Sequence, residues 1–78
     1  MAKVMTDRDI MKGAMHERKT FQKDLAEKMG VNQSTISTNM RRDKIGLNVF
    51  VKLLEALDYD VAVVDRKTGE VKWTVEVK

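Results

Sequence analysis

No cysteine occurs among the 78 residues of this sequence. The fold can therefore depend neither on disulfide bonds nor on a zinc site with thiolate ligands, and it must be held by a packed core, which oligomerisation could enlarge. Apolar runs are short as well. None approaches the roughly 18 residues of a membrane-spanning helix, and the N-terminus lacks the apolar centre of a signal peptide. We expect one domain, residues 1–78, in a cytoplasmic protein.

Side chains that catalyse reactions are equally scarce. His16 is the only histidine, and its place on a helix beside Glu17 and Arg18 indicates a surface position. The sequence contains no cluster of metal ligands, no nucleophile paired with a base and no glycine-rich phosphate loop. We therefore expect no enzyme activity, no cofactor and no metal. Four methionines are expected to fill the core: Met11, Met15, Met29 and Met40.

The net charge of +3 is unevenly distributed along the chain. Residues 1–52 contain 11 Lys and Arg against 6 Asp and Glu, whereas residues 53–78 contain 4 against 6. The basic first part is compatible with binding to a polyanion, and equally with an ordinary solvated surface. Charge alone leaves both interpretations open.

Caps and apolar residues at three- and four-residue spacing predict three helices in the first half of the chain. Thr6, followed by acidic residues, predicts a helix over about residues 7–18. Thr20 is expected to cap a second helix that ends at Gly30, because glycine accepts a left-handed backbone just past a helix. Asn32 is expected to begin a third helix.

The second half of the chain predicts one more helix and two strands. After a connection at residues 43–46, residues 47–57 form a helix that is apolar over more than half of its circumference, so it requires a covering layer. Residues 59–65 form a β-type run and residues 66–69 a turn with glycine. In residues 70–78, apolar and polar side chains alternate strictly.

The fold class is thus predicted to be mainly α with a C-terminal β-hairpin. Residues 6–58 would form the helical part and residues 59–78 the hairpin, with one apolar face on its last strand. A lone two-stranded hairpin is marginally stable. It must therefore pack on the fourth helix, pair with another chain, or do both.

The third helix has an unusual composition. Its sequence, N-Q-S-T-I-S-T-N-M-R-R from Asn32, contains only Ile36 and Met40 as apolar residues and no Asp or Glu. Serine, threonine and asparagine are weak helix formers, so the packing of the two apolar side chains must override local propensity. With both of them inward, two outward rows remain: Gln33, Ser37 and Arg41 in one, and Ser34, Thr38 and Arg42 in the other.

Such side chains suit the major groove of DNA. Glutamine can bond bidentately to adenine, and serine and threonine can bond several base edges. The lack of carboxylates lets the helix approach phosphates. Two short helices joined by a tight turn with glycine, the second polar and basic, therefore indicate a DNA-binding helix-turn-helix. The alternative is a polar surface helix.

Residues 20–58 resemble the lambda-repressor-like helix-turn-helix family, which includes the Xre proteins and phage repressors. The resemblance is carried by Gln22, Leu25-Ala26, Gly30-Val31, Asn32-Gln33-Ser34 and Ile36, and it resumes at F-V-K-L-L-E-A-L-D, residues 50–58. It implies a four-helix DNA-binding domain in a regulator of transcription, encoded by a prokaryote or a phage and associated with the nucleoid.

The resemblance also implies roles for individual residues. Gln22 would contact a phosphate and brace Gln33, the first residue of the recognition helix. Ala26 would let the two motif helices touch, and Gly30 would make the turn. Base reading is implied for Gln33, Ser34 and Thr38, to which the outward row adds Ser37. Contacts with the DNA backbone or groove edge are assigned to Asn32, Arg41, Arg42 and Lys44.

The sequence departs from the family at two places. The family usually has Ser or Thr directly before its leading glutamine, whereas here Phe21 stands there and Thr20 precedes it. We therefore expect the second helix to begin one residue early. The family's common fifth helix is missing, and the valine-rich hairpin replaces it.

A single helix-turn-helix reads only a few base pairs, so we expect a repressor of the phage or mobile-element type that binds a palindromic operator as a homodimer. The subunit contact is expected in the hairpin, through sheet extension or face-to-face packing of Val61, Val63, Val71, Trp73 and Val75. Alternatively, the hairpin covers the fourth helix of its own subunit, or it binds another protein such as the toxin of a toxin–antitoxin pair. A third hypothesis is an interaction adaptor that does not read DNA.

Overall fold

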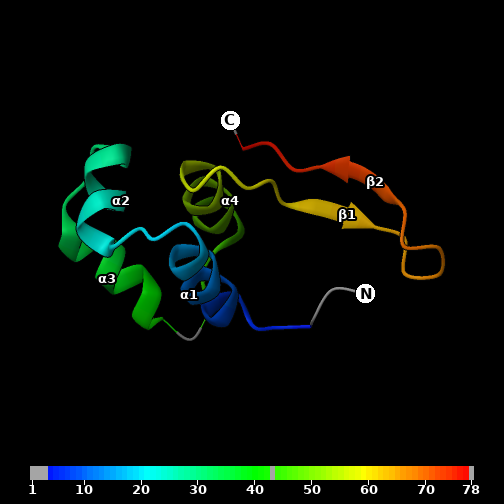
Figure 1. Cartoon of the computed structure of the whole chain (residues 1–78), viewed down its shortest axis with the longest axis horizontal. Coiled ribbons are helices and arrows are strands. Elements are labelled where there is room, and N and C mark those ends of the chain that lie inside the picture. Colours follow the sequence, from blue (N-terminus) through cyan, green and yellow to red (C-terminus); the bar gives the residue numbers. More distant parts are fainter. Residues whose placement is uncertain (1–3, 43, 78) are drawn as a thin grey trace.

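The computed structural model describes residues 4–42 and 44–77, in which four helices precede a two-stranded antiparallel sheet (Figure 1). The elements are α1 (Asp7–Glu17), α2 (Gln22–Met29), α3 (Gln33–Arg41), α4 (Leu47–Ala56), β1 (Ala62–Val64) and β2 (Val71–Thr74). The predicted fold class is confirmed. Asp43 and Lys78, at the ends of a predicted connection and a predicted strand, lie outside the described residues. Across the described ranges, no helix has the length and apolar character needed to span a membrane.

The first helix has the predicted cap. The hydroxyl oxygen of Thr6 accepts a hydrogen bond from the Asp9 N–H at 3.2 Å, which satisfies one of the free N–H groups at the start of α1. Asp7 and Asp9 lie in the first turn, where negative charge is favourable. The carboxylate of Asp7 also accepts the N–H of Ile45 at 2.7 Å, so it ties the segment before α4 to the start of α1.

The prediction that the second helix begins one residue early, behind a Thr20 cap, is wrong. Phe21 is the N-cap, and α2 begins at Gln22. Thr20 belongs to the end of α1, because its N–H bonds to the Met15 carbonyl at 2.9 Å after Lys19 has adopted a left-handed backbone with φ of 52°. The phenylalanine side chain has no hydrogen-bond acceptor, so it cannot cap the free N–H groups of α2. Instead, the carboxylate of Asp24 in the first turn accepts the backbone N–H of Phe21 at 3.2 Å.

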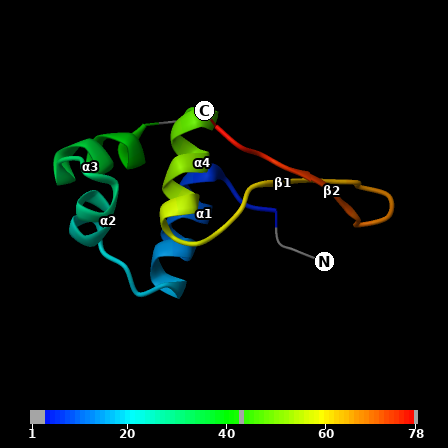
Figure 2. The ribbon, with the colours of Figure 1, turned by 90° about the horizontal axis from the view of Figure 1, so that it is seen from above.

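The core lies between α1, α4 and the α2–α3 pair. Its fully buried side chains come from all four helices: Met11, Leu25, Ile36, Val51 and Leu53. Met15 is buried too, and Met29 and Met40 are half-buried against the core, as expected of core methionines. No polar or charged residue is buried among the described residues. The core is therefore purely apolar, with α4 as its central helix (Figure 2).

The hairpin does not cover α4, which was one of the arrangements that the sequence left open. The apolar surface of α4 is used by α1 and α2, which both pack against it. All residues of β1 and β2 are exposed, and the strands pack chiefly on each other. Of the described residues after α4 and its C-cap Leu57, Tyr59 and Val61, where the chain enters the hairpin, are the ones that pack against the core. In both ribbon views the hairpin projects from the helical body at the end opposite α2 and α3 (Figures 1 and 2).

The two strands are shorter than predicted, and their pairing is irregular. Val63 pairs with Trp73, but Val64 pairs with Val71, so Lys72 is an extra residue in β2. Because neighbouring residues of a strand point to opposite faces, Val63 and Val64 lie on opposite faces of the sheet. Their partners Trp73 and Val71 therefore lie on opposite faces too. The last strand thus presents apolar side chains on both faces of the hairpin, and not on the single face that strict alternation predicted for that strand.

The turn between the strands forms where it was predicted. The Asp65 carboxylate accepts the N–H groups of Lys67 and Thr68 at 2.8 and 3.3 Å. The N–H of Gly69 bonds to the Asp65 carbonyl at 2.7 Å, and Gly69 has a φ of 77°, which a residue with a side chain rarely adopts. This turn fixes the register in which β1 and β2 meet.

Candidate nucleic-acid interface

The turn between α2 and α3 sets the angle at which α3 is presented. Gly30 ends α2 with a φ of 70°, and the N–H of Val31 bonds to the Ala26 carbonyl at 3.0 Å. Ala26 is buried, so its small side chain permits the close packing of α2 on α3. Asn32 is the N-cap of α3 as predicted, but its side chain makes no capping hydrogen bond. That amide is therefore exposed at the start of the helix and available to a ligand.

The polar face of α3 is presented outward. Ile36 is buried, with 1% of its surface exposed, and Met40 is half-buried beside it. Seven polar side chains between residues 32 and 42 are exposed: Asn32, Gln33, Ser34, Thr35, Thr38, Arg41 and Arg42. None of the residues from 32 to 42 is acidic. The exposed face thus offers amide, hydroxyl and guanidinium groups to a ligand that accepts hydrogen bonds and carries negative charge.

Ser37 and Gln22 join the two motif helices. The Ser37 hydroxyl donates a hydrogen bond to the Gln22 side-chain oxygen at 2.8 Å, and the Gln22 amide nitrogen lies 3.9 Å from the Met40 sulfur. Gln22 therefore braces the middle of α3, and the implied brace on Gln33 is not observed. The contact could not be foreseen, because sequence spacing alone does not show which residues of two helices face each other.

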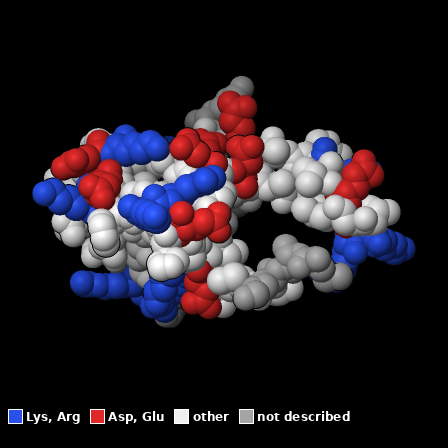
Figure 3. All heavy atoms as spheres, viewed as in Figure 1, with Lys and Arg blue, Asp and Glu red and all other residues white. Residues whose placement is uncertain are grey.

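Basic groups surround the end of α3. Arg41 lies in its last turn, Arg42 is the C-cap, and both side chains are exposed, as is Lys44. Figure 3 shows basic side chains at the lower edge of the helical body, where Figure 1 places α3, and acidic ones gathered near the base of the hairpin. The bond from Ile45 to Asp7 holds the following segment in place. Positive charge therefore borders the amide and hydroxyl row.

Arg18 anchors the base of the hairpin, a role that the sequence did not reveal. Its guanidinium donates to the carbonyls of Leu57 and Asp58 at 2.9 and 3.2 Å and stacks over the Tyr59 ring, 4.0 Å from the centroid. The Tyr59 hydroxyl donates a hydrogen bond to Glu17. These partners are about 40 residues apart in the chain, so no local pattern could have found them. The anchor links the end of α1 to the start of the hairpin.

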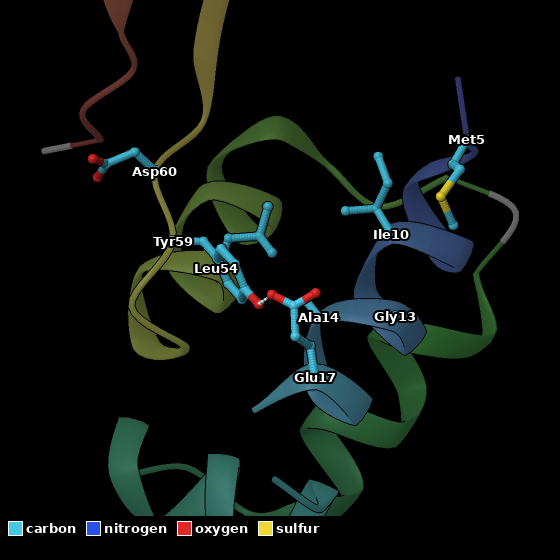
Figure 4. A pocket seen from close by; sticks show the side chains of 8 residues that line it. All are labelled: Met5, Ile10, Gly13, Ala14, Glu17, Leu54, Tyr59 and Asp60. Carbon is cyan, nitrogen blue, oxygen red and sulfur yellow. Dashed lines mark hydrogen bonds between the residues drawn. The ribbon is translucent and has the colours of Figure 1, made fainter. Parts of the chain in front are cut away.

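An apolar pocket of about 310 Å³ lies beside this anchor, between α1 and α4 (Figure 4). Ile10, Ala14 and Leu54 line it, and the bond between Tyr59 and Glu17 crosses it. Its polar lining consists of carboxylates and a phenol, with no nucleophile paired to a base. Among the described residues, no group of three or more His, Cys, Asp or Glu could hold a metal ion.

The anchor predicts a pH dependence. The hydrogen bond to Glu17 raises the pKa of Tyr59 above its usual value of 10.0, with desolvation acting in the same direction. The neutral phenol is thus the form that the folded state favours. Its contribution to the free energy of unfolding should be complete below pH 10 and should disappear as the pH rises through the higher folded pKa.

Urea unfolding of the wild type and of Tyr59→Phe between pH 7 and pH 11 would measure this contribution. The stability difference between the two proteins should be constant up to about pH 10 and should shrink above it. A difference that stays constant across the whole range would show that the hydroxyl contributes nothing through Glu17.

The α2–α3 pair, its glycine turn and the exposed row of amides and hydroxyls define the class: a helix-turn-helix DNA-binding domain. The family model of the bacteriophage CI repressor helix-turn-helix domain matches residues 15–72, from within α1 to within β2. The chain belongs to this family, and it is a DNA-binding regulator of the phage repressor type. No curated protein and no solved structure matches the chain.

Proposed function

We propose that the protein represses transcription by binding a palindromic operator as a homodimer. The observation that carries this proposal is the exposed face of α3, where Gln33, Ser34 and Thr38 lie without any carboxylate and with arginines at one end. Such a face can enter the major groove, because its short side chains neither repel phosphates nor hold the helix away from the bases.

The contacts divide into two kinds. Base edges are assigned to Gln33, Ser34 and Thr38, whose side chains are exposed, and to Ser37. Ser37 already donates its hydroxyl hydrogen to Gln22, so toward DNA its oxygen would act as an acceptor. Phosphate contacts, which position the helix without reading sequence, are assigned to a second group: Gln22, Asn32, Arg41, Arg42 and Lys44.

The dimer contact is assigned to the hairpin. Val63 and Trp73 are 47% and 69% exposed although they pair with each other, and Val64 and Val71 are similarly exposed on the other face. A hairpin with two apolar faces and no covering layer is marginally stable alone. Its position opposite α2 and α3 leaves the DNA-binding face free when a second copy covers it (Figure 1).

The exposed hairpin also favours a second candidate function, in which a different protein covers it. The chain would then be the antitoxin and autoregulator of a toxin–antitoxin pair. Sedimentation of the pure protein separates the two proposals, because an antitoxin of this kind would remain monomeric until its partner is added. The interaction adaptor would in turn show no preference for any DNA sequence.

Selection of binding sites from random DNA tests the main proposal. We expect one enriched motif with two inverted half-sites, whose centres lie about one helical turn, roughly 34 Å, or a multiple of it apart. A single half-site would contradict the dimer and leave the regulator intact. If no motif is enriched, the protein does not read sequence and the proposal fails.

A further inference from the structure

We propose that two copies of this chain join through the free edge of β1, antiparallel about a two-fold axis at Val63, with Asp60 of each copy beside Arg66 of the other. The result would be a four-stranded sheet of order β2-β1-β1-β2. This inference rests on the proposed homodimer and specifies how it is built.

The backbone hydrogen bonds within the hairpin show which groups of β1 are free. The Val61 carbonyl accepts the Val75 N–H at 2.7 Å, and the Asp65 N–H bonds to the Glu70 carbonyl at 2.8 Å. Alternate residues of an antiparallel strand bond to opposite sides. The odd-numbered residues of β1 are therefore directed at β2, and the N–H and carbonyl groups of Ala62 and Val64 are directed away from it, at the open edge.

The two edges of the hairpin differ in how well they can receive another strand. On β2, Lys72 is the extra residue of the irregular pairing, and its side chain forms an ion pair with Glu70 at 3.2 Å. Bulges and lysines are devices by which proteins block the edges of sheets. β1, with the sequence Ala-Val-Val, has neither device. The open edge of β1 is thus the one on which a strand can be added.

The charges beyond β1 select the register. A two-fold axis at Val63 sets Ala62 opposite Val64 of the second copy, so that all the free groups of both strands can bond. Two residues further out, the same axis sets Asp60 of each copy opposite Arg66 of the other, which gives two such pairs. Axes at Ala62 or at Val64 would instead place Asp60 opposite an uncharged residue. Asp60 and Arg66 are both exposed, and opposite charges directly across two strands stabilise a sheet.

The same register unites the exposed apolar side chains. An axis perpendicular to the sheet keeps each face on its own side, so Val63 of one copy lies beside Val63 of the other. Each is flanked by the Trp73 with which it already pairs. Four side chains that are separately exposed would then form one continuous strip across the new sheet, which removes apolar surface from water.

Charge reversal tests the register. Asp60→Arg and Arg66→Asp each place like charges at both ends of the interface, and each should raise the dimer dissociation constant about tenfold. The double variant Asp60→Arg/Arg66→Asp restores opposite charges in reversed order and should return the constant to near the wild-type value. Sedimentation equilibrium over a range of concentrations measures all three, and far-ultraviolet circular dichroism checks that each variant is folded.

Lys72→Glu is the matched control, because it reverses a charge on β2 and should leave the dissociation constant unchanged. The inference would be overturned if the single variants left the dissociation constant unchanged, or if the double variant dissociated as readily as either single one. If the wild type were still a dimer in that case, the proposed homodimer would stand and its interface would lie elsewhere. A monomeric wild type with a single selected half-site would overturn both. Binding to one isolated half-site should be the same in every variant, because the hairpin lies at the end of the helical body opposite α2 and α3 (Figure 1).

Discussion

Replacing Ile36 by alanine is expected to lower the free energy of unfolding by about 2–5 kcal/mol. Ile36 is the one buried residue of α3, with 1% of its surface exposed, and it holds that helix against α2 and the core. Domains of this size have a free energy of unfolding of only about 5–15 kcal/mol. Urea unfolding at neutral pH measures the loss directly.

Thr38→Ala is the matched control on the same helix. Thr38 is exposed, and its replacement should change the stability by less than about 0.5 kcal/mol while it weakens specific DNA binding. If Ile36→Ala cost no more than the control, α3 would be held by something other than its packing. The pair of variants thus separates the side chain that anchors the recognition helix from one that is proposed to read DNA.

The helices could be predicted because their signals are local. Thr6, Gly30 and Asn32 act within a few residues of their own positions, and each stands at a helix end as expected. Thr20 misled for the same reason, since its hydroxyl resembles a cap. The left-handed backbone at Lys19 instead makes Thr20 the last part of the α1 terminus.

What could not be predicted depends on contacts between distant residues. Alternation in the tail predicted a strand with an apolar face that needs a partner. It could not show that α1 and α2 already occupy the apolar surface of α4. The extra residue Lys72, which puts Val71 and Trp73 of β2 on opposite faces of the hairpin, likewise has no local signal. The anchor of Arg18 on Tyr59 joins two segments that the sequence treats as unrelated.

Within the candidate site, the sequence predicted the exposed row but not its support. Gln33, Ser34 and Thr38 are exposed as the helical projection required. Ser37, in the same projection, turned out to be half-buried and bonded to Gln22. A projection treats a helix as an isolated cylinder, whereas the neighbouring helix decides which part of a polar face remains open. The weak intrinsic propensity of α3 is therefore offset by contacts with α2 as well as by the core.

The last prediction separates base reading from phosphate contact. Gln33→Ala should lower the discrimination at one base position of the selected operator by about 1–3 kcal/mol, because a bidentate contact to one base is lost. Binding to unrelated DNA should be almost unchanged. Competition assays against operators with each of the four bases at every position would locate the loss of base discrimination. The loss should be confined to one position in each half-site.

Arg42→Ala should have the opposite signature. It should weaken all DNA sequences alike, and the slope of the logarithm of affinity against the logarithm of salt concentration should become shallower by about 0.9 for each lost phosphate contact. Lys52→Ala, which removes the same charge from an exposed position on α4, should leave that slope unchanged. If Gln33→Ala flattened the slope and left base preference intact, α3 would lie across the DNA backbone and not in the groove.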